Sequence, residues 1–148
     1  MDIEILYFDV HHAIKTHDWI IEHSGGLAGV YPDGAGKLES VLEHIQNDWY
    51  YPTFEDKLTH LIYSINKLHA FCDGNKRSSL VLGAYFLELN GYNYCVNKFV
   101  LEMENIVVWL AESKISKELL CKLVTSIIEN EDDYSESLKY ELICAIQD

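Results

Sequence analysis

The sequence predicts an all-α fold: a helical bundle around one buried central helix, with a short flap or hairpin as its extended piece. From Phe54 to Leu68, apolar residues recur every three or four positions, which is the spacing of one helix face. From Leu80 to Leu87 the chain is apolar nearly all round, and it then reaches Asn90 and Gly91, a common helix stop. Hydrophobic residues make up 49% of the chain, which favours a packed core over disorder.

Two helices and two irregular segments are predicted ahead of this pair. Residues 10–23 suit a helix that ends in a left-handed cap at Gly25 and Gly26. The stretch 24–36 holds five of the eight glycines and one of the two prolines, so it is predicted to be a loop. A second helix is expected where apolar residues return at helical spacing: Leu38, Val41, Leu42 and Ile45. Residues 48–53 break that period with strand-favouring aromatics, and this predicts the flap or hairpin.

Three more amphipathic stretches, at about 99–111, 116–128 and 134–146, predict the remaining helices. The acidic run 129–133 separates the last two and is expected to be a solvated connection. At 148 residues the chain has the length of one domain, with a core at about 7–128 and an additional C-terminal helix at about 134–147.

The formal net charge of -13 argues against nucleic acid or an anionic membrane as a partner, because such surfaces require clustered Lys and Arg. The acidic N-terminus lacks the basic start of a signal peptide, and no apolar run is long enough to cross a bilayer. A cytoplasmic location is therefore expected. Four widely spaced cysteines fit neither a zinc site nor a disulfide scaffold and are predicted to be reduced thiols: Cys72, Cys95, Cys121 and Cys144.

The residues that indicate chemistry lie between the two strongest helices, from His69 to Arg77. A buried helix that starts at about Asn75 points its free backbone N–H groups into this turn, and such groups bind phosphate oxygens. Gly74 allows the backbone to come close, while Lys76 and Arg77 add cationic donors at the same spot. Arg77 is the only arginine in the chain.

Two further side chains complete a possible reaction centre. Asp73 supplies a hard oxygen ligand for Mg²⁺, which in phosphate sites is held by one or two carboxylates and by the nucleotide itself. His69 can take a proton near neutral pH. Transfer of a phosphate-containing group to a hydroxyl requires this combination of base, metal ligand and anion site.

These nine residues resemble the motif of the Fic/death-on-curing family, His-x-Phe-x-Asp/Glu-Gly-Asn-Gly/Lys-Arg, at every position. The run Ser24 to Gly29 also resembles the death-on-curing branch, and the resemblance covers about residues 7–110. It implies a Fic fold with His69 as general base, Phe71 as the anchor of the loop and Asp73 as the magnesium ligand. It further implies that the donor phosphates are held by the last four motif residues: Gly74, Asn75, Lys76 and Arg77.

Two departures from the broader Fic pattern bear on the reaction. Lys76 stands where nucleotidyl-transferring members usually carry glycine, and its side chain fills the space in which inner phosphates would lie. In the death-on-curing branch this lysine goes with a reversed nucleotide, which favours transfer of the terminal phosphate. Leu80 stands where many Fic enzymes have a second arginine, and this too resembles the death-on-curing branch.

A stretch near the C-terminus, Thr125 to Asn130, matches the family's self-inhibition pattern Ser/Thr-x-x-x-Glu-Gly/Asn. The inhibitory glutamate acts on that second arginine, which this chain lacks, so the match at Glu129 is interpreted as chance. The resemblance instead implies silencing by a separate antitoxin chain whose segment packs on the enzyme.

Other interpretations of these features stay open. The 69–77 turn could be an ordinary polar connection, or the remnant of an inactive relative that only binds a partner. Trp49, Tyr50 and Tyr51 could form the family's flap, which pairs with the target and presents its hydroxyl to His69, or could simply pack between helices. Cys72 is interpreted as a spacer. The remaining six histidines show no metal-ligand spacing: His11, His12, His17, His23, His44 and His60.

The function expected from this resemblance is that of a toxin-like protein kinase using ATP and Mg²⁺. It would transfer the γ-phosphate to a Ser or Thr hydroxyl of a protein substrate, by resemblance a translation factor such as elongation factor Tu. The alternatives are AMP or other nucleotidyl transfer by the same fold, and a non-catalytic binding module.

Overall fold

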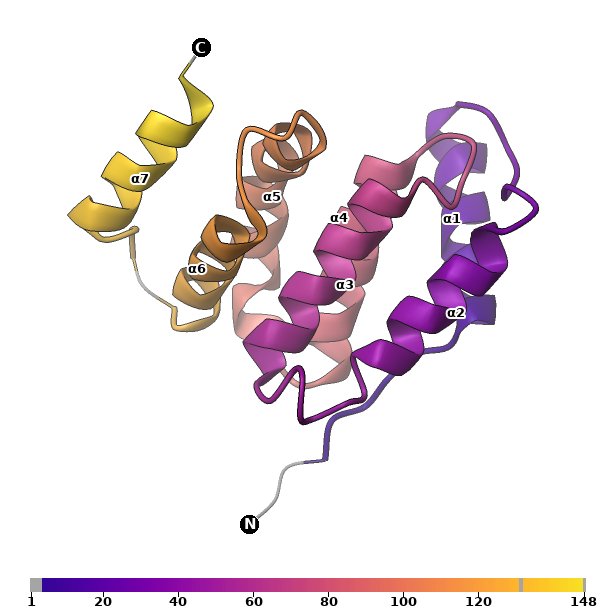
Figure 1. The fold of residues 1–148 in the computed structure, drawn as a ribbon, viewed down its shortest axis with the longest axis horizontal. Coiled ribbons are helices and arrows are strands. Elements are labelled where there is room, and N and C mark those ends of the chain that lie inside the picture. The colour runs from indigo at the N-terminus through magenta and orange to yellow at the C-terminus, as the bar shows by residue number, and fades with distance from the viewer. Residues whose placement is uncertain (1–3, 131, 148) are drawn as a thin grey trace.

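The computed structural model describes residues 4–130 and 132–147, and within them the chain is a bundle of seven α-helices with one short 3₁₀ turn and no β-strand (Figure 1). The all-α prediction is confirmed. The helices are α1 (Val10–Ser24), α2 (Gly34–His44), α3 (Phe54–Leu68), α4 (Asn75–Leu89), α5 (Val96–Ala111), α6 (Lys117–Ile128) and α7 (Glu136–Ile146), and the 3₁₀ turn η1 is Asn93–Cys95.

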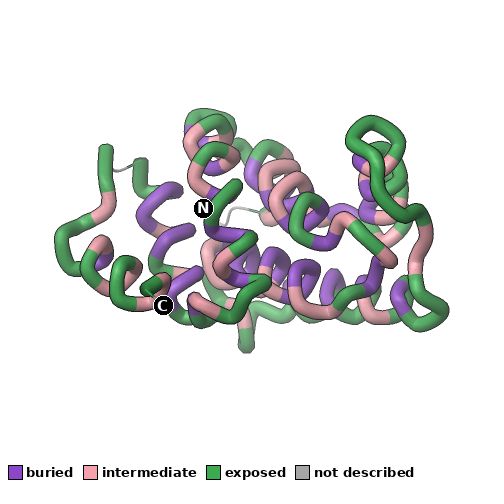
Figure 2. Tube along the Cα trace, turned by 90° about the horizontal axis from the view of Figure 1, so that it is seen from above, coloured by how far each residue is buried: buried purple, intermediate pink, exposed green. Residues whose placement is uncertain are grey.

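Helices α3 and α4 form the centre of the bundle. Helix α4 packs against α1, α3 and α5, and α3 packs against α2, α5 and α6 as well as α4. The two helices approach closely at Gly83, where an added Cβ would lie 3.1 Å from Cγ1 of Ile62 and 3.0 Å from Cζ of Phe99. Both helices carry many buried residues, and Figure 2 shows buried segments, in purple, on helices throughout the middle of the bundle. The prediction of a central buried helix at 80–87 is therefore confirmed.

Local signals set the ends of this central pair. The hydroxyl of Thr53 accepts from Asp56 N–H and the Asp56 carboxylate accepts from Thr53 N–H, which forms a capping box at the start of α3. Helix α3 ends at His69, whose backbone is left-handed (φ 50°, ψ 47°), and α4 begins after Gly74, which is also left-handed. Because α3 and α4 are joined by this short turn and lie side by side, residues 69–74 sit at one end of the bundle (Figure 1).

The prediction of a flap or hairpin at residues 48–53 is wrong, because turns and bends occupy this segment. The Asn47 side-chain oxygen accepts from the backbone N–H groups of Trp49 and Tyr50, at 3.0 and 3.3 Å, and this local bonding replaces strand pairing. The buried ammonium of Lys57 donates to the Ile45 carbonyl and to the Asp48 carboxylate, both at 2.8 Å, and fixes the start of the same turn.

The C-terminal helix α7 is present as predicted and packs against α6, at the edge of the bundle farthest from α1 (Figure 1). Among its described residues only Leu138 is buried. All four cysteines are free thiols, as the sequence predicted. None of the described helices combines the length and the apolar character that a membrane span requires.

Candidate active site

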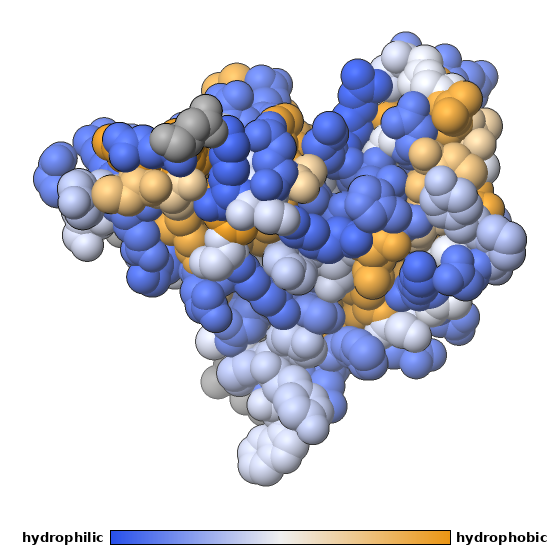
Figure 3. All heavy atoms as spheres, turned by 45° about the horizontal axis from the view of Figure 1, so that its top comes forward, coloured by the Kyte–Doolittle hydropathy of each residue, from blue (hydrophilic) through white to orange (hydrophobic). Residues whose placement is uncertain are grey.

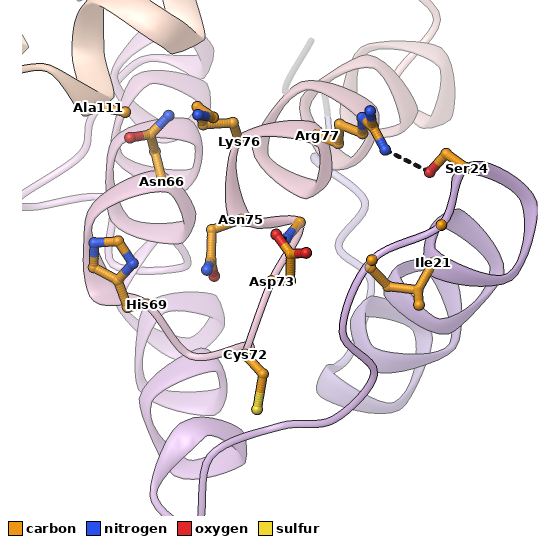
Figure 4. Close-up of a pocket in the computed structure, with 13 residues that line it drawn as sticks. Ile21, Ser24, Asn66, His69, Cys72, Asp73, Asn75, Lys76, Arg77 and Ala111 are labelled. Atoms are coloured by element: carbon orange, nitrogen blue, oxygen red, sulfur yellow. Dashed lines mark hydrogen bonds between the residues drawn. The ribbon is translucent and has the colours of Figure 1, made fainter.

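A cavity of about 580 Å³ opens at the N-terminal end of α4. Figure 3 shows the surface hollowed between two shoulders at this end of the molecule, with mainly hydrophilic residues around the hollow. The cavity wall comes from five parts of the chain: the end of α1 with the following glycines, the end of α3, the turn before α4, the first turn of α4, and the last residue of α5 (Figure 4). Its lining residues include Ile21, Asn66, Ala111 and every residue from 72 to 77.

His69 caps α3 and lines one side of this cavity. Its left-handed backbone is unusual for a residue with a side chain and turns the chain sharply out of the helix. The imidazole is exposed, and within the described residues it makes no hydrogen bond. In Figure 4 it faces Asp73 across the opening, with Asn75 between them. An exposed imidazole without a partner is free to accept a proton from a bound molecule.

The Asp73 carboxylate is held in place by backbone amides while remaining open to the cavity. One oxygen accepts from Gly74 N–H at 2.8 Å and the other from Leu27 N–H at 3.1 Å. These two hydrogen bonds, first that from Leu27 and then that from Gly74, and the nearby charge of Arg77 lower the pKa of Asp73 below its ordinary value. The side chain is therefore a fixed anion with lone pairs left for a cation.

The first turn of α4 presents backbone donors to the cavity. No side chain caps the helix, and the first backbone bond at this end runs from Ser78 N–H to the Gly74 carbonyl. Within the described chain, the N–H groups of Asn75, Lys76 and Arg77 have no acceptor and lie where the helix dipole favours an anion. Gly74 (φ 77°) fits tightly here, because an added Cβ would lie 3.2 Å from Ile21 and 3.4 Å from His17.

The two cations at the start of α4 point to different sides of the cavity (Figure 4). The Lys76 side chain extends towards Asn66 and the α3 side, where His69 lies. Arg77 extends to the α1 side and donates to the Ser24 hydroxyl at 2.6 Å. Lys76 and Arg77 therefore lie on opposite sides of the helix end, and an anion bound there would have a cation on each side.

Asn75 has a different position from the one the sequence suggested. Its side chain is buried, accepts from Phe71 N–H at 3.3 Å and donates to the Phe71 carbonyl at 3.0 Å. The carboxamide thus closes the loop, and its backbone N–H is the group that faces the cavity. Phe71 is buried, as expected for an anchor.

The glycine-rich loop after α1 pairs with the turn before α4. Tyr31 N–H donates to the Ala70 carbonyl at 2.9 Å, and Cys72 N–H donates to the Gly29 carbonyl at 3.0 Å, so that Val30 and Phe71 form an isolated antiparallel bridge. Gly26 lies directly against the carboxylate, because an added Cβ would be 2.7 Å from Asp73 Oδ2. The loop therefore forms one wall of the site.

His17 of α1 also contacts the site, although its sequence context does not predict this. This histidine is fully buried, its Nε2 lies 2.6 Å from the Asp73 carbonyl, and its ring stacks on Phe71 with centroids 3.8 Å apart. No local pattern distinguishes it from the other histidines, since its contact with Asp73 spans 56 residues.

The structure does not bring Trp49, Tyr50 and Tyr51 to the site. They precede Phe54, the first residue of α3, whereas His69 follows its last residue. A helix of 15 residues is about 22 Å long at 1.5 Å per residue, so the aromatic turn lies at the other end of the bundle. Trp49 and Tyr50 are also 89% and 77% exposed, so they do not pack between helices either.

The inhibition-like stretch Thr125 to Asn130 is also remote from the cavity. The Ile128 carbonyl at the end of α6 accepts from the Tyr94 hydroxyl, which follows the C-terminal end of α4. His69 and the candidate phosphate site lie at the N-terminal end of α4. Glu129 is therefore at the wrong end of α4 to act on the site within this chain.

The sequence model of the Fic/DOC family matches residues 7–87, which include α1 to α3, the complete cavity turn and all but the last two residues of α4. The chain belongs to the Fic/DOC family. No curated protein matches it. Members of this family are typically transferases that modify proteins, and they bind a nucleotide, often with Mg²⁺.

The residues present fit a nucleotide with Mg²⁺. Within the described chain, no group of three His, Cys, Asp or Glu side chains could enclose a metal without help. Mg²⁺ in phosphate-transfer sites is commonly held by one or two carboxylates together with the phosphates, and Asp73 beside the free amides of α4 offers that arrangement.

Proposed function

We propose that the protein is a kinase of the death-on-curing type, which transfers the γ-phosphate of ATP to a Ser or Thr hydroxyl of a target protein. His69 takes the proton of the attacking hydroxyl, because its imidazole is exposed and unpartnered at the cavity mouth. Asp73 would hold Mg²⁺, which would supply positive charge to the donor phosphates. The α4 amides, Lys76 and Arg77 hold the donor in line with the hydroxyl oxygen.

The position of the Lys76 side chain favours transfer of the γ-phosphate over transfer of a nucleotidyl group. Its side chain occupies the α3 side of the helix end, which is also the side of His69 (Figure 4). A glycine here would leave that space to the inner phosphates of a nucleotide, whereas the ammonium excludes them and attracts the more highly charged terminal phosphate. The terminal phosphate would then face the base.

The acceptor is proposed to reach the site along the glycine-rich loop. The N–H groups of Tyr31 and Cys72 make the two hydrogen bonds of the Val30–Phe71 bridge. The N–H and C=O of Val30 itself therefore point away from Phe71. The Val30 backbone is therefore open to an extended segment of a target, which would enter beside the Asp73 carboxylate. A translation factor such as elongation factor Tu is the expected target by resemblance.

An antitoxin chain is proposed as the inhibitory partner. An apolar cavity of about 230 Å³ between α1 and α4 is lined by Trp19, Leu80 and Val81, and it shares Ser24 and Arg77 with the candidate active site. A helix laid into it would cover Arg77. Expression of the chain alone should arrest growth, and coexpression of the product of a neighbouring gene should relieve the arrest.

Labelled ATP tests the reaction directly. With a cell lysate as the source of acceptor, label from the γ-phosphate should appear on protein, and label from the α-phosphate should not. His69→Ala should abolish transfer, and Lys76→Gly should shift transfer from γ towards α label. Protein labelled from the α-phosphate by the unchanged chain would establish nucleotidyl transfer. Absence of both labels, with intact Mg·ATP binding, would favour a binding module.

A further inference from the structure

The buried histidine of α1 makes a contact with the candidate site that packing alone does not explain. The Asp73 carbonyl can only accept a hydrogen bond, so His17 Nε2, at 2.6 Å, carries the proton and donates it. The same ring lies parallel to Phe71, with an interplanar angle of 3°. His17 thus contacts both ends of the 71–73 segment, one through stacking and the other through a hydrogen bond.

A histidine at position 17 is unfavourable for stability in one respect, because its second ring nitrogen, Nδ1, lacks a hydrogen-bond partner among the described residues. Nδ1 is buried and has no hydrogen-bond partner among the described residues, since the nearest acidic oxygen, Asp18 Oδ1, is 3.6 Å away. An unsatisfied buried polar atom destabilises the folded chain. A phenylalanine would stack on Phe71 without that cost, so the hydrogen bond to Asp73 is the feature that the histidine adds.

The hydrogen bond from His17 affects the Asp73 carboxylate through the peptide group between Asp73 and Gly74. The Asp73 carbonyl and the Gly74 N–H belong to the same planar trans peptide and point in opposite directions. His17 holds the carbonyl side of this plane, and the N–H on the other side donates to Asp73 Oδ1 at 2.8 Å. Rotation of the peptide would remove the donor that fixes the carboxylate.

We propose that His17 is a positioning residue, which orients the Asp73 carboxylate towards the metal-nucleotide by fixing the Asp73–Gly74 peptide plane. This inference deepens the function proposed above and rests on it for the identity of the bound group. His17 itself contacts neither substrate nor metal, because it is fully buried behind the loop.

Two substitutions separate the hydrogen bond from the stacking. His17→Phe keeps an aromatic ring against Phe71 and removes the donor, whereas His17→Gln keeps an N–H at the place of Nε2 and removes the ring. His12→Phe is the matched control, since His12 also lies on α1 and stacks on a ring, that of Tyr85 at 4.3 Å, remote from the cavity.

The first readout is the binding of Mn²⁺, used as a probe for Mg²⁺, in the presence of ATP, followed by electron paramagnetic resonance. His17→Phe should weaken Mn²⁺ binding roughly ten-fold, the effect of losing one hydrogen bond near a charged group. His17→Gln should recover most of that loss, and His12→Phe should leave Mn²⁺ binding unchanged. Equal effects of His17→Phe and His12→Phe, or no recovery with glutamine, would overturn the proposal.

The second readout needs neither activity nor a folded variant. Long-range ¹H–¹⁵N spectra of the unsubstituted protein should show His17 as the Nε2–H tautomer, with a hydrogen-bond coupling to the Asp73 carbonyl. The Nδ1–H tautomer would overturn the proposal. If the unsubstituted protein bound no metal-nucleotide, the proposed function would fail, while this spectrum would still decide whether His17 holds the loop.

Discussion

Asn75 holds both backbone polar groups of Phe71, accepting from its N–H and donating to its carbonyl. The same two-point contact recurs at the other end of α4, where the Asn90 carboxamide accepts from Leu6 N–H at 2.8 Å and donates to the Leu6 carbonyl at 3.0 Å. Helix α4 therefore carries an amide side chain at each end that fixes a neighbouring segment. Of the two, only Asn75 fixes a segment of the candidate active site.

These paired contacts predict different outcomes for the same substitution. Asn75→Asp and Asn90→Asp each replace a donor by an oxygen that faces a carbonyl, and each should lower the free energy of unfolding by about 1–3 kcal/mol in urea titrations. Asn75→Asp should in addition weaken ATP binding measured by calorimetry, while Asn90→Asp should not. Normal ATP binding by folded Asn75→Asp would show that the loop does not depend on this clamp.

The contact between Gly26 and Asp73 yields a second prediction. A Cβ at Gly26 would lie 2.7 Å from Asp73 Oδ2, whereas one at the adjacent Gly25 would meet nothing within 4 Å. Both glycines have positive φ, 122° and 80°, so alanine costs backbone strain of about 1 kcal/mol at either position. Gly26→Ala should add a displacement of the carboxylate and weaken Mg²⁺ binding. Gly25→Ala should lower stability alone.

Calorimetric titration of Mg²⁺ into each protein with ATP present measures the difference between the two alanine variants. The prediction fails if both variants bind Mg²⁺ as the unsubstituted chain does, since the close approach of Gly26 would then have no influence on the carboxylate.

The left-handed backbone of His69 predicts that replacing this residue by glycine removes activity without lowering the free energy of unfolding. A left-handed residue with a side chain costs roughly 1–2 kcal/mol, and glycine avoids this cost while losing about 0.5–1 kcal/mol of chain entropy. His69→Gly should therefore be as stable as the unsubstituted chain or more so, and more stable than His69→Ala. Both should lack transfer activity. Thermal unfolding of the three proteins gives the order, and a Gly variant less stable than the Ala variant would contradict this account.

The elements that the sequence predicted well are those specified by neighbouring residues. Helix α3 shows its buried face as an apolar stripe, and the turn from His69 to Arg77 shows its chemistry within nine residues. Residues 48–53 do not form the predicted flap or hairpin: their aromatic side chains favour a strand, whereas the side chain of Asn47 forms a turn with the backbone there.

The remaining parts of the site depend on contacts between distant residues. His17 meets Asp73 across 56 positions, and Val30 pairs with Phe71 through a loop that the sequence identified only as glycine-rich. Lys57 likewise lies within the α3 stripe yet is fully buried, since its ammonium finds two oxygens outside the helix. The spacing of apolar residues predicts which face of a helix is buried. It does not predict which group a buried polar side chain contacts.

A last prediction concerns pH and comes from a histidine outside the site. Burial, and then the charges of Lys117 and His44, lower the pKa of His60 from 6.5 to about 4. The Lys117 ammonium donates to His60 Nδ1 at 2.9 Å, which requires that ring nitrogen to be unprotonated. Between pH 6.5 and 4 the unfolded chain therefore binds a proton that the folded chain does not, so the free energy of unfolding falls as pH falls through this window.

The loss should amount to about 1–2 kcal/mol after allowance for solvent screening of a partly exposed ring. His60→Phe should flatten the dependence of urea unfolding on pH between 6.5 and 4. Lys117→Met should flatten it partly, because one of the two neighbouring charges is gone. Lys122→Met serves as the control, since that lysine pairs with Glu141 and does not face His60. An unchanged slope in His60→Phe would mean that the ring stays protonated in the fold and that its contact with Lys117 is not made in solution.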